Sequence, residues 1–416
     1  MAVFVLFFIA AVIIFIGFLG EIIFDKTNIP DVIWLMLVGI IIGLFFGDFT
    51  KGDALTQIAP VFTTFALVFI LFEGAINLNI TYVAKGLLKG LNLTLVNFIF
   101  SASAIAVIMM MFGWELLPGL LLGAALGGAS SAVVVPIVKK LKIKKESATV
   151  LTIESALSDV LCIVSAITII NIIKLNTFNL SSVLASILGA FSIALLIGAV
   201  GGFIWVTIQN FLQKFSKSYM TTIAFLLVIY SFTEFVGANG AIACLAFGLM
   251  LGNAHKLKRK SDEVFALPHE AKFFYAELTF FIKSFFYVYL GMLMDFSNLY
   301  LVLIGLLITL VLFLLRPLSI FLTVGSKAGE KDRIFMEIMI PKGLAAAVLA
   351  QLALQEQIQH AEYFSTIVVS VILLSIILAT VLVFFTERGS FKGVQKTLHD
   401  FLFTSKLGAN KENNQK

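Results

Sequence analysis

Two acidic residues interrupt an otherwise apolar stretch: the segment 154–159 contains Glu154 and Asp159, with Ser155 and Ser158 between them. An ionisable side chain in such apolar surroundings is energetically costly and usually has a functional role. On a helix, Ser155 and Asp159 are four residues apart and share a face. Glu154 and Asp159 point about 140° away from each other. Two carboxylates on different faces indicate two tasks: one binds and releases ions, and the other forms a permanent ion pair.

The carboxylate of Asp159 is the group that we expect to bind ions. Alkali cations prefer hard oxygen ligands. The candidate ligands are the Asp159 carboxylate, the Ser155 hydroxyl, Glu73, and the hydroxyl of Ser130 or Ser131. A buried carboxylate also binds a proton more readily than one in water. A proton and a cation then compete for Asp159, and this competition produces exchange if the carrier moves only when Asp159 is neutralised.

The composition places these residues in a membrane protein. Of the 416 residues, 60% are hydrophobic and only 13% are charged, and the mean hydropathy is +1.06. A soluble domain is usually about 25% charged, so lipid must solvate much of this surface. The cysteines and histidines show no disulfide or metal-ligand spacing, and no nucleotide-binding fingerprint is present. We therefore expect no resident metal or other cofactor, no nucleotide, no nucleic-acid partner and no enzymatic activity.

Thirteen apolar segments predict an all-α polytopic protein with about 13 transmembrane helices. Most are long enough to cross the roughly 30 Å hydrocarbon layer. Continuous apolar runs disfavour a membrane β-barrel, which needs short segments of alternating polarity. The segments are 3–24, 29–47, 57–76, 91–113, 117–138, 148–173, 181–211, 219–236, 239–253, 273–294, 299–323, 333–355 and 363–386.

The basic residues predict the orientation of the chain. With thirteen crossings, nearly all lysines and arginines outside the spans fall on the side of the C-terminal tail, and only Lys51 and Lys174 fall on the other. Basic loops remain in the cytoplasm. We therefore expect a multi-pass protein of the cytoplasmic membrane with its N-terminus outside and its C-terminus inside. We expect residues 1–387 to form the transmembrane domain and residues 388–416 to form a short cytoplasmic tail.

The fifth and twelfth spans indicate where the chain carries its cargo. Spans 1–6 and 8–13 begin on opposite sides of the membrane, which predicts two inverted six-helix repeats. The fifth span contains Gly127, Gly128 and Pro136, and the twelfth contains Pro341 and Gly343. Such paired, broken helices near the membrane midplane point to a transport site. The alternative is that the small residues only let helices pack closely.

Five motifs give the chain a family resemblance. They are Phe69-Ile-Leu-Phe-Glu73-Gly74-Ala75, Glu154-Ser-Ala-Leu-Ser-Asp159, Tyr289-Leu-Gly-Met292, Leu315-Arg316-Pro317 and Pro341-Lys342-Gly343. Over residues 5–390, the chain resembles the monovalent cation:proton antiporter superfamily, of the sodium/proton exchanger type. The resemblance implies a homodimer, with a dimerisation part and a six-helix ion-carrying core that moves like an elevator. It implies Asp159 as the carrier of ion and proton, Glu73 and Ser155 as further ligands, and a structural ion pair between Glu154 and Lys342.

The chain departs from the family pattern at three places, one of which is Lys342, where most members have Arg. Ser158 stands where most exchangers have Asn or Asp, directly before the carrier aspartate. This pair of positions therefore contains one titratable side chain, Asp159. We keep Ser158 in the set of residues that we expect to bind the cation and the proton. Ser130-Ser131-Ala132 replaces the Thr-Asp-Pro of many electroneutral members. The motif Gly128-Ala-Ser-Ser-Ala-Val-Val-Val-Pro136 instead resembles the branch that includes potassium efflux systems. The choice between Na⁺ and K⁺ therefore stays open.

Two further basic residues, Lys283 and Arg316, lie inside predicted spans. We assign both to supporting roles. Arg316 belongs to the motif of the eleventh span. Lys283 either neighbours Asp159 or supports the crossing helices.

The sequence therefore predicts an antiporter that exchanges Na⁺ or Li⁺ for H⁺ electroneutrally, by competition at Asp159. A K⁺/H⁺ antiporter is the second interpretation. A cation channel is less favoured, because no loop resembles a selectivity filter. A sodium-coupled symporter of an organic anion is also less favoured, because the site is richer in carboxylates than in unpaired cations.

Overall fold

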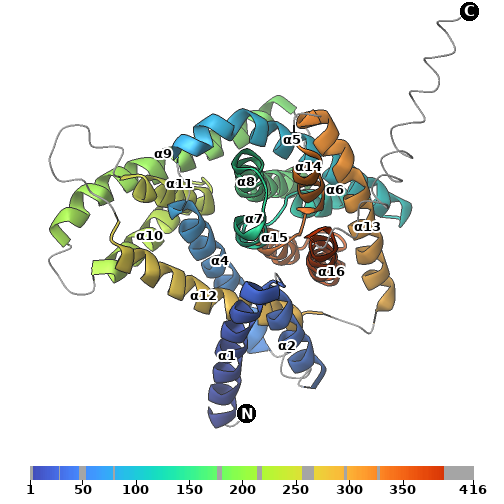
Figure 1. Cartoon of the computed structure of the whole chain (residues 1–416), viewed down its shortest axis with the longest axis horizontal. Coiled ribbons are helices and arrows are strands. Elements are labelled where there is room, and N and C mark those ends of the chain that lie inside the picture. Colours follow the sequence, from blue (N-terminus) through green and yellow to red (C-terminus); the bar gives the residue numbers. More distant parts are fainter. Residues whose placement is uncertain are drawn as a thin grey trace, which may run out of the picture.

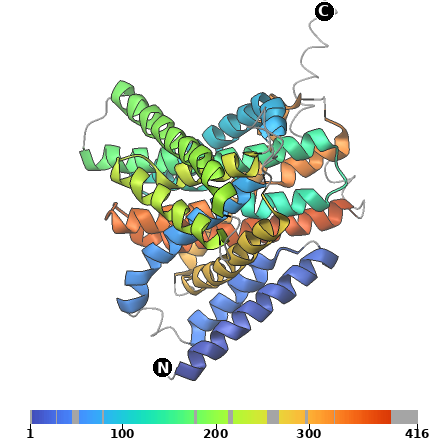
Figure 2. The same ribbon diagram turned by 90° about the vertical axis from the view of Figure 1, so that its left-hand side faces the viewer.

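The computed structural model describes residues 3–27, 29–45, 53–77, 80–175, 180–212, 218–254, 267–294, 298–325 and 328–387. Within these ranges the regular elements are α-helices (Figures 1 and 2), so the predicted all-helical fold is confirmed. They are α1 (Val3–Thr27), α2 (Asp31–Phe45), α4 (Asp53–Ile76), α5 (Ile80–Met111), α6 (Leu116–Leu126), α7 (Ser131–Lys140), α8 (Lys145–Leu175), α9 (Leu180–Leu212), α10 (Ser218–Phe235), α11 (Gly240–Gly252), α12 (His269–Met292), α13 (Leu299–Thr323), α14 (Glu330–Ile338), α15 (Leu344–Gln355) and α16 (Ala361–Glu387). The predicted cytoplasmic tail, 388–416, lies outside the described residues.

Eight helical segments in the described ranges are long and apolar enough to cross a membrane. They are Phe7–Phe24, Leu88–Met111, Leu116–Val138, Lys145–Lys174, Leu188–Gln209, His269–Met292, Leu299–Thr323 and Ala361–Glu387. Shorter apolar helices cover Asp31–Phe45, Val61–Ile76, Tyr219–Phe235, Gly240–Gly252 and Leu344–Gln355. The long and short apolar helices together follow the apolar segments that the sequence predicts.

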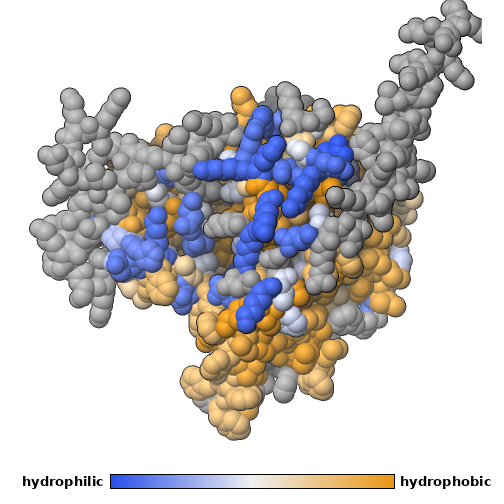
Figure 3. All heavy atoms as spheres, in the orientation of Figure 1, coloured by the Kyte–Doolittle hydropathy of each residue, from blue (hydrophilic) through white to orange (hydrophobic). Residues whose placement is uncertain are grey.

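Large apolar side chains cover much of the outer surface. On α1, Phe4, Phe8 and Phe15 are exposed, and Figure 3 shows a hydrophobic surface where α1 and α2 project from the other helices. Hydrophilic residues gather over the middle of the same view. A contiguous apolar surface of this kind is unfavourable in water, so this distribution fits a protein whose helices face lipid.

Two helices are interrupted, as the sequence predicts for the fifth and twelfth spans. The first break separates α6, which ends at Leu126, from α7, which begins at Ser131. The second separates α14, which ends at Ile338, from α15, which begins at Leu344. Pro341 lies in the second break, and it has no backbone N–H to continue a helix. Each break creates helix ends whose backbone donors and acceptors need partners outside the helix.

Helix α8 lies at the centre of the molecule, beside both breaks (Figure 1). It packs against α5, α6, α7 and α15. The segment 154–159 therefore lies where the two interrupted helices approach each other. A side chain on Gly128 would not fit between the first break and α8, because its Cβ would lie 2.7 Å from the Cys162 Sγ atom and 3.0 Å from the Ser158 backbone oxygen.

Candidate functional site

Asp159 lies against the first residue of α7. The Ser131 hydroxyl donates a hydrogen bond to the Asp159 Oδ2 atom at 2.6 Å, and the Ser131 backbone N–H donates to the same atom at 3.3 Å. The N-cap residue Ser130 forms no side-chain cap of its own. The carboxylate thus accepts from the N-terminal end of α7, which carries partial positive charge. The predicted proximity of Asp159 and Ser131 is present, and Asp159 is only 8% exposed.

Ser158 holds the first break against α8. Its Oγ atom accepts from the Ala129 backbone N–H at 3.0 Å and lies 3.0 Å from the Ala129 carbonyl, to which it donates. Ser155 is fully buried and donates to the Thr152 carbonyl at 3.1 Å. Both hydroxyls therefore have protein partners in this structure. Ser158 is engaged in positioning the break, and Ser155 lies one helical turn from Asp159 on the same side of α8.

The two breaks are bonded directly to each other. The Ser130 backbone N–H donates to the Pro341 carbonyl at 2.8 Å. A Cβ added to Gly343 would lie 2.1 Å from the Ser130 Oγ atom, so glycine is required for this close approach. Ser130 is buried, and its side chain packs into the space that Gly343 leaves. Of the predicted ligand serines, Ser130 thus contacts the second break, whereas Ser131 contacts the carboxylate.

Lys342 is directed at the C-terminal end of α6. Its Nζ atom donates to the Gly128 carbonyl at 2.8 Å, and the side chain is 1% exposed. The last carbonyls of a helix have no partners within the helix and carry partial negative charge. Gly128 lies in the break, two residues past the last residue of α6, so the lysine binds the segment that directly follows one half-helix, and Asp159 accepts from the start of the next. We call the place where the two breaks meet the crossing. It holds one buried acidic and one buried basic side chain, Asp159 and Lys342, and each lies beside a helix end of opposite polarity.

The predicted ion pair between Glu154 and Lys342 is wrong as a direct contact, because Glu154 pairs with Arg316 of α13. The Arg316 Nη2 atom donates to Glu154 Oε2 at 2.7 Å, and Nη1 contacts Oε1. The planar guanidinium matches both carboxylate oxygens, which a single ammonium cannot do. Arg316 also donates to the Met336 carbonyl at 3.0 Å and to the Met339 carbonyl at 3.3 Å. It thus stabilises the C-terminal end of α14.

Lys283 forms an ion pair away from Asp159. Its Nζ atom lies 2.6 Å from the Asp31 Oδ2 atom, and both side chains are largely buried. Asp31 is the first residue of α2, which packs against α12, the helix of Lys283. Of the two interpretations that the sequence left open, the structure favours a supporting role. Lys283 joins α12 to α2.

Glu73 lines a cavity that reaches the crossing. The cavity has a volume of about 330 Å³, and its walls include Glu73, Ser131, Thr152 and Lys283. Glu73 accepts a hydrogen bond from the Asn77 side chain at 2.7 Å. Ser131 belongs both to this cavity and to the hydrogen bond with Asp159. The Ser131 hydroxyl therefore connects the cavity with the buried carboxylate.

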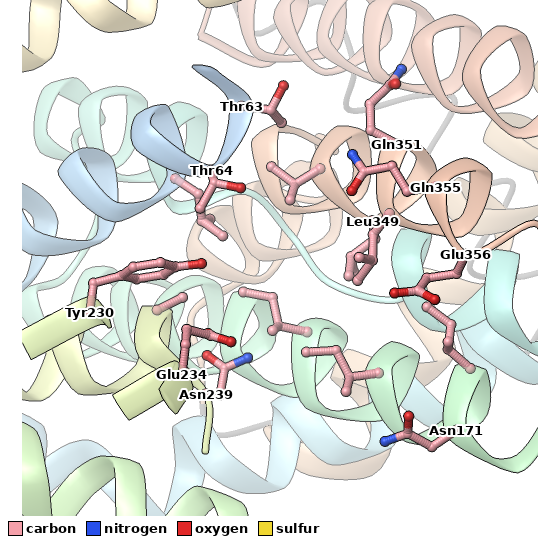
Figure 4. Close-up of a pocket in the computed structure, with 17 residues that line it drawn as sticks. Thr63, Thr64, Asn171, Tyr230, Glu234, Asn239, Leu349, Gln351, Gln355 and Glu356 are labelled. Carbon is pink, nitrogen blue, oxygen red and sulfur yellow. The ribbon is translucent and has the colours of Figure 1, made fainter. Parts of the chain in front are cut away.

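A second cavity, of about 260 Å³, lies farther along α8 (Figure 4). Tyr230, Glu234 and Asn239 face it from one side, and Gln355, the last residue of α15, and Glu356, which follows it, face it from another. On α8, the first cavity includes Thr152 and Ala156, and the second includes Ile163, Ile167, Ile170 and Asn171. Asp159 therefore lies between the two cavities along the helix.

The comparison with protein families decides the class of this molecule. The family of transmembrane sodium/hydrogen exchangers matches residues 9–388. The chain belongs to this family. It is therefore a multi-pass membrane antiporter, and the family resemblance of the motifs is confirmed.

Individual relatives differ in the cation that their names state. The Na⁺/H⁺ antiporter 1 of Methanocaldococcus jannaschii is 26% identical over 341 residues, which is 78% of each chain. The K⁺/H⁺ antiporter NhaP2 of Shewanella oneidensis is 23% identical over 369 residues, covering 85% of this chain and 61% of NhaP2. The structure of the sodium proton antiporter MjNhaP1 from M. jannaschii at pH 8 matches with a TM-score of 0.75 and 24% identity, over 91% of this chain and 96% of that one. This exchanger has the same fold.

Two carboxylates of structural importance were not singled out in the sequence. Asp31 binds Lys283, and Asp332 accepts from the Lys144 backbone N–H at 3.2 Å and the Ser147 hydroxyl at 2.8 Å. Both lie in the first turn of a helix, where acidic residues are common. That signal marks a helix start but does not identify a distant partner. Within the described ranges, no group of three or more His, Cys, Asp or Glu residues is arranged to hold a metal ion.

Proposed function

We propose that this antiporter exchanges Na⁺ for H⁺ across the cytoplasmic membrane, with Asp159 as the shared binding group. The observation that carries the proposal is the position of its carboxylate: buried, bonded by Ser131 and located between two cavities. In the bare site, both Ser131 donors stabilise the anion. A proton neutralises the carboxylate directly. For a cation, the Ser131 hydroxyl rotates so that its oxygen joins Asp159 as a ligand, with Ser155 and Glu73 as further oxygen donors.

The same arrangement supports access of ions to Asp159 from the two sides of the membrane in turn. We assign the chain thirteen spans in two inverted repeats, a dimerisation part, an ion-carrying core that moves like an elevator, and a homodimeric assembly. The N-terminus lies outside and the C-terminus in the cytoplasm. The two cavities on either side of Asp159 support this proposal, because a small displacement of the crossing closes one and opens the other. The Ser130–Pro341 bond supports movement of the two broken helices as one unit.

The choice of cation is tested by comparing Na⁺, Li⁺, K⁺ and Rb⁺ in proteoliposomes that carry an internal pH dye. We expect Na⁺ and Li⁺ to dissipate an imposed pH gradient. A response to K⁺ alone would instead favour K⁺/H⁺ exchange, which the likeness to NhaP2 makes the second candidate. If no alkali cation dissipates the gradient, exchange at this site is excluded. Cation flux that persists without any proton movement would indicate a channel.

Glu73→Ala is expected to raise the apparent KM for the cation more than it lowers the maximal rate. Asp159 can still bind a proton without Glu73, whereas the cation loses one oxygen ligand. The expected rise in KM is roughly tenfold, equivalent to about 1.4 kcal/mol of binding. Glu21→Ala is the matched control, because Glu21 lines the same cavity and carries the same charge. Complete loss of exchange in Glu73→Ala would make Glu73 an essential carrier, and an unchanged KM would remove it from the ligand set.

Exchange is expected to be electroneutral, with one cation for one proton. Ser158 cannot carry a second charge, and Lys283 is held by Asp31, so Asp159 is the group that each half-cycle neutralises. A second proton per cycle would couple transport to the membrane potential by about 2.3 kcal/mol per 100 mV. The measurement clamps proteoliposomes with K⁺ and valinomycin and follows Na⁺-driven pH changes at several potentials. An initial rate that is independent of potential agrees with the prediction. A sustained current that Lys283→Gln removes would contradict it.

A further inference from the structure

Tyr287 of α12 is completely buried, but its hydroxyl group has no partner. The side chain is 0% exposed, and in the part of the chain that the structure describes its oxygen atom forms no hydrogen bond. A buried polar group without a partner is destabilising, so one that is present in a folded protein calls for an explanation. A phenylalanine would fill the same space without this cost. The hydroxyl itself therefore needs a function.

Two helices place Tyr287 and Asp159 beyond the wall of the same cavity. On α12, the first cavity is lined as far as Lys283, and Tyr287 follows one turn later on the same face. On α8, the cavity is lined as far as Ala156, and Asp159 follows within the next turn. The charges of Asp31 and Asp159 both act on the Tyr287 hydroxyl, which agrees with this placement. The hydroxyl thus lies in the electrostatic field of the ion-binding carboxylate.

The two carboxylates that act on Tyr287 differ in their own partners. Asp31 is neutralised by Lys283, whose Nζ atom lies 2.6 Å from its Oδ2 atom. Asp159 accepts hydrogen bonds from Ser131 and, among the residues that the structure describes, forms no ion pair. A cation in this region is therefore attracted to Asp159 rather than to Asp31. The Tyr287 hydroxyl lies near the carboxylate that still needs a counter-charge.

The hydroxyl groups around Asp159 also differ in what else they bind. Ser155 donates to the Thr152 carbonyl, and Ser158 bonds to the backbone of Ala129. Tyr287 has no such task, so its oxygen can bind a cation without the loss of an existing hydrogen bond. A tyrosine hydroxyl is uncharged near neutral pH. It therefore adds an oxygen ligand, which an alkali cation prefers, without adding a charge.

Helix α12 holds Tyr287 in a fixed place. It packs against α2 (Figure 1), and a Cβ on Gly39 of α2 would lie only 2.0 Å from the Val288 carbonyl oxygen. The ion pair between Lys283 and Asp31 joins the same two helices. Helix α8, in contrast, packs against α5, α6 and α7. The hydroxyl thus approaches the crossing from a different group of helices, on a rigid element of the kind that holds a ligand in position.

We infer that the Tyr287 hydroxyl oxygen is a further ligand of the cation that Asp159 carries. The inference rests on the proposed function of Asp159. A proton bonds directly to a carboxylate oxygen and needs no further ligands, whereas an alkali cation needs several oxygen atoms. Tyr287 therefore raises the affinity for the cation relative to the proton in their competition at Asp159.

The test compares the purified wild type with Tyr287→Phe and Tyr289→Phe. Tyr289→Phe is the matched control, because it removes the same hydroxyl from the same helix, and a shift of two residues directs it to a different face. Na⁺ and K⁺ are titrated in a thermal-stability assay in detergent at constant ionic strength, and cation-driven exchange is measured in proteoliposomes. For the transported cation, we expect Tyr287→Phe to raise the apparent dissociation constant and the KM roughly tenfold, as for the loss of one contact to a charged group. The maximal rate should change little, and the control should match the wild type.

Three outcomes would overturn the inference and leave Asp159 in its proposed role. The first is an unchanged cation affinity in Tyr287→Phe. The second is an equal loss of affinity in both tyrosine variants. The third is a lower maximal rate with an unchanged KM, which would indicate a packing role. Asp159→Asn tests the proposed function separately: if this variant is stabilised by the cation as the wild type is, the proposed function fails, and the inference fails with it. A melting transition without added Na⁺ or K⁺ shows that each variant has folded.

Discussion

Replacing Asp159 with asparagine is expected to abolish cation/proton exchange and to leave the protein folded. The asparagine side chain keeps an oxygen that can accept both hydrogen bonds from Ser131. It has no charge at any pH of interest, so it can neither bind a proton nor attract a cation. The carrier would remain permanently neutral, and protons and cations would no longer compete. We expect the rate in liposomes to fall to that of protein-free vesicles.

The control for this experiment is Asp332→Asn. Asp332 is also buried and also accepts two hydrogen bonds from the start of a helix, but it lies away from the two cavities. Its replacement should lower thermal stability while exchange continues in the folded fraction. The dye assay used for the wild type measures both variants. Substantial exchange by purified Asp159→Asn would remove Asp159 from the central role proposed above.

The parts of the fold that follow from local sequence could be predicted. Apolar segments of sufficient length become helices in lipid, because the backbone must satisfy its hydrogen bonds internally. The breaks near Gly128 and Pro341 have local causes, since glycine and proline weaken helices wherever they occur. Polar residues are dense both in α8 and in the first break, which indicates that the two segments lie side by side. The contact of Asp159 with Ser131 follows from that placement.

Partner choice among buried charges could not be predicted in the same way. The sequence contains Lys342, Arg316 and Lys283 as candidate partners for two carboxylates, and spacing does not rank them. The distance between α13 and α8 decides that Arg316 reaches Glu154. Likewise, the packing of α2 on α12 brings Asp31 to Lys283. Such choices depend on how helices pack in three dimensions, which a single sequence does not reveal.

The buried charges share one arrangement that only the structure makes visible. Lys342 donates to a carbonyl at the end of α6, and Arg316 donates to carbonyls at the end of α14. At each break, a basic residue that lies outside the first half-helix therefore binds carbonyls at or just past the end of that half-helix. The two differ in their carboxylate partners: Arg316 also binds Glu154, whereas Lys342, within the part of the chain that the structure describes, forms no ion pair with the carrier aspartate. This leaves Asp159 available for an ion.

Breaking the Glu154–Arg316 pair is expected to be strongly destabilising. Both side chains are almost completely buried, at 1% and 0% exposed. Arg316→Met leaves the Glu154 carboxylate without its partner, and Glu154→Gln leaves the guanidinium uncompensated. Removing one member of a buried pair typically costs about 3–5 kcal/mol. Replacing both residues, in Glu154→Gln/Arg316→Met, should cost much less than the sum of the single changes, because no unpaired charge remains.

A double-mutant cycle distinguishes this pair from the one that the sequence suggested. Thermal stability in detergent is measured for Glu154→Gln, Arg316→Met, Lys342→Met and the two double variants that contain Glu154→Gln. We expect strong non-additivity for Glu154 with Arg316, because their atoms form two hydrogen bonds. Glu154 with Lys342 should be close to additive, because the Lys342 ammonium binds the Gly128 carbonyl instead. The reverse pattern would return Glu154 to Lys342, and Arg316 would then act only on the end of α14.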